Sequence, residues 1–117
     1  MSDNLKIDYV ELPTGNFDLV QAFYESVFGW KFTDYGPEYR AFHDGKTEGG
    51  FYLSELRSST ETGAALVIIY AENLEGMRDA VVANGGTIVR DIISFPGGRR
   101  FQFADPHGNE LGIWSDK

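Results

Sequence analysis

The chain has 117 residues, of which 42% are hydrophobic and 15% aromatic. This length and apolar content are typical of one folded domain, so we expect a single domain over residues 1–117. Its formal net charge of −8 argues against nucleic acid and against an anionic membrane as partners, since both require a basic surface. The absence of cysteine excludes disulfides and thiolate metal sites, and the absence of a long apolar run or an evident signal peptide predicts a cytoplasmic protein.

The first part of the chain reads as a strand, a helix and three further strands. Alternating side chains predict a strand over Leu5–Pro13. Asn16 is a helix N-cap candidate, and apolar residues at helical spacing predict a helix over residues 17–28 that ends at Gly29. Three strands are then expected, over residues 30–35, 39–43 and 49–55.

The second part follows the same order after a polar linker over residues 57–63. An apolar, β-rich run predicts a strand over residues 64–71, and Asn73 is the N-cap candidate of a second helix that stops at residues 84–86. Three more strands are expected, over residues 87–93, 99–105 and 109–114.

The two parts look like a structural repeat. Shifting the sequence so that Asn16 superposes on Asn73 also superposes Gly29 on Gly86. Identity between the parts is otherwise low, and chance agreement of common cap and stop residues is the alternative explanation. Either explanation leads to an α+β domain with two βαβββ halves, over about residues 5–56 and 64–116.

The last strands form a closing hairpin around a tight turn. Asp105, Pro106 and Gly108 occupy the first, second and fourth positions, as a type I turn prefers. Alternation on both sides of the turn gives one apolar face that requires a helix and one mixed face. The mixed face can line a pocket.

Three segments resemble the vicinal oxygen chelate superfamily, which includes glyoxalase I, bleomycin-resistance proteins, fosfomycin-resistance proteins and extradiol dioxygenases. They are FYESVFGWKF (Phe23–Phe32), NGGTIVRD (Asn84–Asp91) and FADPHGNELGIW (Phe103–Trp114). The nearest match is the small glyoxalase-like branch, often described as related to lactoylglutathione lyase. The resemblance implies one glyoxalase-like module, in which curled mixed sheets surround a cavity, and it implies pairing of modules, here as a homodimer.

The resemblance also identifies positions that hold a metal in the metal-dependent members. Three of them correspond to Tyr9, Leu66 and Gly112, and the fourth lies near Phe51–Leu53. Leucine and glycine offer no donor atom, and tyrosine is a poor ligand for zinc or nickel. We therefore expect no bound metal and no cofactor.

Aromatic and small residues occupy the positions that the resemblance directs into the cavity. Strand alternation places Tyr9, Tyr70 and Trp114 there together with Leu66 and Gly112. Aromatic rings with a polar group suit a pocket for a small, partly apolar molecule. The alternative is that these side chains fill a cavity that has no ligand.

Charged residues are the remaining candidates. Glu11 and Glu110 can both approach the cavity rim, as an acid–base pair or by chance. Arg99 is a candidate for pairing with an anionic group of a ligand, and its neighbour Arg100 is the equivalent alternative; either can instead be a rim charge. The two histidines, His43 and His107, adjoin turns and are expected at the surface.

The sequence therefore predicts a metal-independent glyoxalase-like protein that binds a small organic molecule in a dimeric cavity. The reaction is unassigned, and whether the protein is an enzyme is left open. The alternative is a metal-dependent lyase, isomerase or dioxygenase of the same superfamily.

Overall fold

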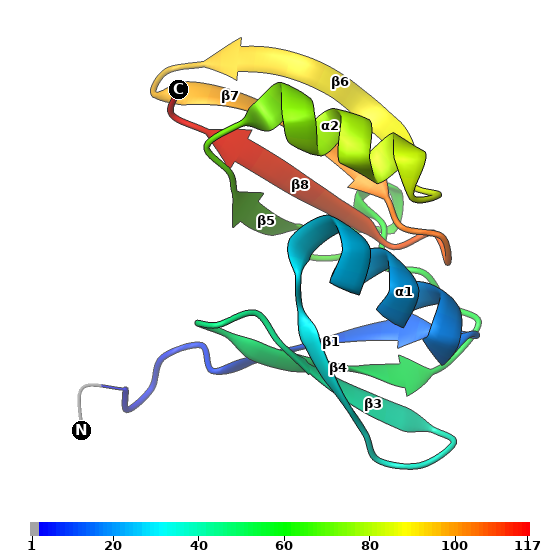
Figure 1. Cartoon of the computed structure of the whole chain (residues 1–117). Coiled ribbons are helices and arrows are strands. Elements are labelled where there is room, and N and C mark those ends of the chain that lie inside the picture. Colours follow the sequence, from blue (N-terminus) through cyan, green and yellow to red (C-terminus); the bar gives the residue numbers. More distant parts are fainter. Residues whose placement is uncertain (1–2) are drawn as a thin grey trace.

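A computed structural model describes residues 3–117 (Figure 1). The first half contains one helix and four strands: β1 (Tyr9–Thr14), α1 (Phe17–Phe28), β2 (Lys31–Asp34), β3 (Tyr39–His43) and β4 (Glu48–Leu53). A 3₁₀ turn, η1 (Thr60–Thr62), precedes the second half. That half contains β5 (Val67–Tyr70), α2 (Leu74–Ala83), β6 (Thr87–Phe95), β7 (Gly98–Ala104) and β8 (Glu110–Ser115).

Both helices begin and end where their local sequence predicts. The side chain of Asn16 accepts a hydrogen bond from the backbone N–H of Leu19, and Gly29 ends α1 in the left-handed conformation with φ 72°. Asn73 caps α2 in the same way, because its side chain accepts from the N–H of Gly76. The predicted helix over residues 17–28 is confirmed.

Each half forms its own four-stranded mixed sheet. The first sheet has the strand order β1-β4-β3-β2 and the second has β5-β8-β7-β6. The first strand of each half runs parallel to the last, and the other neighbours are antiparallel. The predicted α+β fold with two βαβββ halves is confirmed.

The core lies between the two sheets, where α1 contacts both of them (Figure 1). The Tyr24 ring lies 5.5 Å from that of Phe51 in the first sheet, and the Phe23 ring lies 5.9 Å from that of Phe103 in the second. The second helix lies across the second sheet and buries Leu74 and Val81. The helices thus cover one face of each sheet, and we call the opposite face the outer face.

Strand boundaries differ from the prediction where a partner strand is missing. The first strand begins at Tyr9 rather than Leu5, because Tyr9 pairs with Glu48, the first residue of β4. The strand predicted over residues 64–71 is shorter, since the N–H of Ala64 bonds to Ser59 near the 3₁₀ turn. Among residues 3–117, neither helix has the length and apolar character needed to span a membrane.

Candidate functional site

The outer face of the second sheet carries most of the predicted site residues. Strand register places Gly112 beside Ile68 and Gln102, and Trp114 beside Tyr70 and Arg100. Leu111 and Ile113 point to the opposite side and are fully buried in the core. The predicted residues that share this outer face are Leu66, Tyr70, Glu110, Gly112 and Trp114.

A chain of hydrogen bonds crosses this face. Glu110 Oε1 accepts from the backbone N–H and the hydroxyl of Thr60, at 2.9 and 2.8 Å. Glu110 Oε2 accepts from Gln102 Nε2 at 2.5 Å, and Gln102 Oε1 accepts from Arg100 Nη2 at 3.0 Å. Burial raises the pKa of Glu110, but these bonds and the charge of Arg90 outweigh burial and hold the pKa below its ordinary value. Glu110 is therefore a fixed carboxylate that orients Gln102 and Arg100.

A hollow of about 520 Å³ opens beside this chain of hydrogen bonds. Its lining combines apolar side chains with two guanidinium groups. The lining residues are Thr60, Leu66, Arg90, Ile93, Phe95, Arg100 and Gln102. A hollow of this kind suits a ligand that has one apolar and one polar end.

Aromatic side chains continue the same face beyond the hollow. The rings of Tyr70 and Trp114 meet edge to face at 5.2 Å, and Phe95 lies 6.5 Å from Trp114. The Tyr70 hydroxyl donates to Asp116 Oδ1 at 2.6 Å, and this bond is the main cause that raises the pKa of Tyr70 to about 12. Tyr70 therefore stays protonated at neutral pH.

The other two predicted side chains on an outer face, Tyr9 and Glu11, lie on the first sheet. The Tyr39 hydroxyl donates to Glu11 Oε2 at 2.9 Å and lies 2.7 Å from the Tyr9 hydroxyl. Burial, followed by these two hydrogen bonds, raises the pKa of Tyr39. The Tyr39 ring covers Gly50, where a Cβ atom would overlap it. Glu11 lies on the first sheet and Glu110 on the second, with different hydrogen-bond partners, so the chain alone does not bring these carboxylates together.

The residues at the superfamily's metal positions do not fit a metal. The resemblance placed the fourth position near Phe51–Leu53, and register moves it to Gly50, the counterpart of Gly112, because Glu11 pairs with Gly50 as Ile68 pairs with Gly112. The four positions therefore hold two glycines, Leu66 and the phenol of Tyr9. Within residues 3–117, no three histidine, aspartate or glutamate side chains cluster closely enough to hold a metal ion.

The structure separates the two adjacent arginines that the sequence could not distinguish. Arg99 points to the helix side of β7 and forms an ion pair with Glu75 of α2. Arg100 points to the outer face and lines the hollow. The alternation of a strand therefore assigns Arg100, and not Arg99, to the site.

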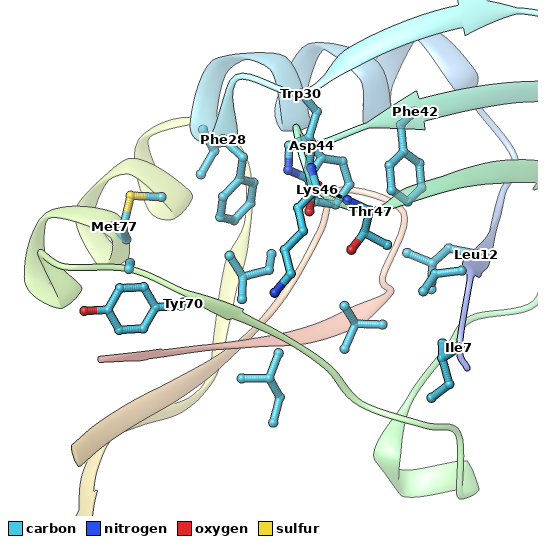
Figure 2. A pocket seen from close by; sticks show the side chains of 16 residues that line it. Ile7, Leu12, Phe28, Trp30, Phe42, Asp44, Lys46, Thr47, Tyr70 and Met77 are labelled. Atoms are coloured by element: carbon cyan, nitrogen blue, oxygen red, sulfur yellow. Dashed lines mark hydrogen bonds between the residues drawn. The ribbon is translucent and has the colours of Figure 1, made fainter. Parts of the chain in front are cut away.

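A second, larger cleft of about 810 Å³ lies between the two halves (Figure 2). Figure 2 shows Phe28, Trp30 and Phe42 on one side and Tyr70 and Met77 on the other, with Lys46 reaching into the space that they surround. The remaining lining comes largely from the edge strands of the two sheets, β1 with Val10 and Leu12, and β5 with residues 67–70. This cleft is mostly apolar.

The histidines differ from one another in their surroundings. His43 lies at a turn as predicted, and its Nδ1 accepts from the N–H of Gly45. His107 is partly buried, contrary to prediction: its Nδ1 accepts from the N–H of Gly15 at 3.2 Å and its Nε2 lies 2.8 Å from the carbonyl of Leu56. It joins two loops and lines neither the hollow nor the larger cleft.

Sequence reasoning also missed several residues of the outer face. Gln102 shares a strand face with Arg100, so alternation could have found it. Thr60 and Tyr39 lie in segments with no sequence signal for the contacts that they make across the fold.

The fold and the two uncovered outer faces define a glyoxalase-like module. A sequence model of the Glyoxalase/Bleomycin resistance protein/Dioxygenase superfamily matches residues 6–113, and the chain belongs to this superfamily. No curated protein matches the sequence.

Solved structures share the fold at low sequence identity. A glyoxalase/bleomycin resistance protein/dioxygenase family enzyme from Burkholderia phytofirmans PsJN has a TM-score of 0.76 and 20% identity, over 95% of this chain and 100% of that one. A glyoxalase-related enzyme from Fulvimarina pelagi has a TM-score of 0.74 and 20% identity, over 95% and 88%. A lactoylglutathione lyase from Agrobacterium tumefaciens has a TM-score of 0.71 and 18% identity, over 95% and 93%. At these identities the likeness shows the fold alone.

Proposed function

We propose that this protein binds a small organic molecule without a metal, in a cavity that a second copy of the chain completes. The observation that carries the proposal is the hollow on the outer face of the second sheet, on the side opposite α2. Its lining joins apolar side chains to fixed polar groups, as small-molecule sites do. Because Gly112 has no side chain, it leaves space on this outer face that a larger residue would fill.

The need for a second copy follows from how the outer faces are placed. The helix-facing sides of both sheets meet in the core of one chain, so its two outer faces point away from each other. The predicted residues Tyr9 and Glu11 are therefore separated from those of the second sheet. A partner chain that sets its first sheet opposite the second sheet of this one would bring both sets into one cavity.

The cleft between the halves supports the same arrangement. It is bordered by β1 and β5, each of which has one edge without a hydrogen-bonded neighbour among residues 3–117. The adjoining segment exposes 97% of Leu5 and 95% of Ile7. Unpaired edges and apolar side chains of this kind are usually covered, and we assign the cover to the second copy.

No reaction is assigned to the site. Both oxygens of Glu110 are occupied by hydrogen bonds, and the Tyr39 and Tyr70 hydroxyls remain protonated because their pKa values are raised. These groups hold and orient more readily than they exchange protons. The alternative of a metal-dependent lyase, isomerase or dioxygenase would require donors at positions that here hold glycine, leucine and tyrosine.

A fragment screen by ligand-observed NMR tests the proposal. We expect hits on the wild type, and we expect Gly112→Phe to abolish them because a ring there fills the outer face. Val82→Phe is the matched control, since Val82 is exposed on α2, on the helix side of the second sheet. Hits that bind Gly112→Phe as well as the wild type would place the site elsewhere, and a wild type without hits would refute ligand binding.

A further inference from the structure

The arginines of this chain fall into two groups. Arg40, Arg78 and Arg99 each form an ion pair with a carboxylate. Among residues 3–117, Arg57, Arg90 and Arg100 do not, although the chain carries an excess of acidic residues. Of these three, Arg90 and Arg100 line the hollow on the outer face of the second sheet. In an acidic protein, two arginines without ion pairs in one hollow are a notable local concentration of positive charge.

The carboxylate of Glu110 lies near these arginines but does not form an ion pair with them. Glu110 is only 6% exposed, and its oxygens accept from Thr60 and Gln102. Gln102 in turn accepts from one nitrogen of Arg100, which fixes the guanidinium and leaves its other N–H groups available. Glu110, Arg90 and Arg100 together carry a net positive charge. The N–H donors of Arg100 are held in place before any ligand binds.

The apolar part of the hollow lies beside these donors. Leu66, Ile93 and Phe95 line it together with the two guanidinium groups. Register places Ile93 directly opposite Arg100 on the neighbouring strand. A ligand that contacts these apolar side chains therefore places its other end within reach of the arginines.

We propose that the hollow binds a small organic anion, whose carboxylate pairs with Arg90 and Arg100 and whose apolar or aromatic part packs on Leu66, Ile93 and Phe95. Guanidinium groups recognise carboxylates through paired N–H donors, which gives both affinity and orientation. This inference rests on the proposed function and specifies the chemical class of its ligand.

The test compares two probes of the same shape, phenylacetate and its neutral amide phenylacetamide, by NMR titration of the ¹⁵N-labelled full chain. We expect phenylacetate to bind at least about tenfold more tightly and to shift the signals of residues 90, 100 and 102. Arg100→Gln and Arg90→Gln should each weaken phenylacetate binding by about tenfold or more and leave phenylacetamide unaffected. Arg99→Gln is the matched control, because Arg99 lies on the other side of the same strand, and it should bind phenylacetate as the wild type does.

Each outcome separates this inference from the proposed function. Equal binding of acid and amide at the hollow would overturn the anion site and leave a small-molecule site intact. Unchanged phenylacetate binding by Arg100→Gln and Arg90→Gln would also overturn it. Signal shifts confined to residues outside the hollow, or no binding of either probe at millimolar concentration, would overturn the anion site, whereas the proposed function fails only if the fragment screen gives no hits on the outer face.

Discussion

The hydroxyl of Tyr24 donates a hydrogen bond to Asp105 Oδ2 at 2.8 Å, and this bond joins two buried residues from opposite halves of the chain. Tyr24 lies on α1, and Asp105 begins the turn between β7 and β8. The second oxygen of Asp105 accepts from the N–H groups of His107, Gly108 and Asn109. One carboxylate therefore shapes the closing turn and attaches it to the helix of the first half.

We expect Tyr24→Phe to lower the free energy of unfolding by about 1–3 kcal/mol, because it removes the donor and leaves a buried carboxylate oxygen less satisfied. Burial, and then the charge of Asp105, raises the pKa of Tyr24, so its proton is present throughout the working range. Urea denaturation followed by fluorescence measures the change. Tyr35→Phe is the control, because Tyr35 is largely exposed, and equal stability of both variants would contradict the role given to Tyr24.

Gly50 and Gly112 occupy equivalent positions and should respond differently to alanine. A Cβ at Gly50 overlaps the Tyr39 ring, so Gly50→Ala displaces Tyr39 from Tyr9 and Glu11 and should cost about 1–2 kcal/mol. A Cβ at Gly112 meets its nearest atoms at 3.5 Å, an ordinary contact, so Gly112→Ala should change stability by less than about 0.5 kcal/mol. Thermal unfolding of the two variants compares them directly, and a reversed order would refute this packing.

The carboxylate of Glu110 should give stability a specific pH dependence. Its pKa is lowered by folding, so its stabilising contribution is complete above the ordinary value of 4.5 and is lost as pH falls through the lowered folded value. Glu110→Gln places an amide donor against an amide donor of Gln102, and we expect a cost of about 1–3 kcal/mol at neutral pH. Urea unfolding from neutral to acidic pH should show this difference shrinking on the acid side. If the difference in unfolding free energy between the wild type and Glu110→Gln did not change with pH, the ionised carboxylate would not be the form that stabilises the fold.

The proposed dimer should depend on the exposed segment before β1. Light scattering of the wild type at micromolar concentration should give about twice 13.1 kDa. Ile7→Asp should shift the mass toward that of one chain without loss of fold, because the Ile7 side chain makes almost no contact within its own chain. Leu56→Asp changes another exposed apolar residue and should leave the dimer intact. A monomeric wild type would remove the partner from the proposed cavity.

The part of the fold that the sequence predicted best is the part set by neighbours in the chain. Asn16 and Gly29 act within one helical turn of themselves, and they placed both ends of α1 correctly. The turn at Asp105 likewise follows from hydrogen bonds that span at most four residues. Because each of these signals is local, a single sequence contains all of the information that they need.

The arrangement of the site depended on contacts between distant residues. Arg99 and Arg100 have the same chemistry in the sequence, and only the position of α2, with Glu75 beside Arg99, decides which of them faces the hollow. His107 looked like a surface residue because Gly15 and Leu56, its partners, lie far from it along the chain. The sequence by itself determined the family, the helices and the order of helices and strands along the chain. Tertiary packing decided the order of strands in each sheet and whether a polar side chain lies on the covered or the outer face, because a strand presents two faces and only its neighbours in space determine which one is covered.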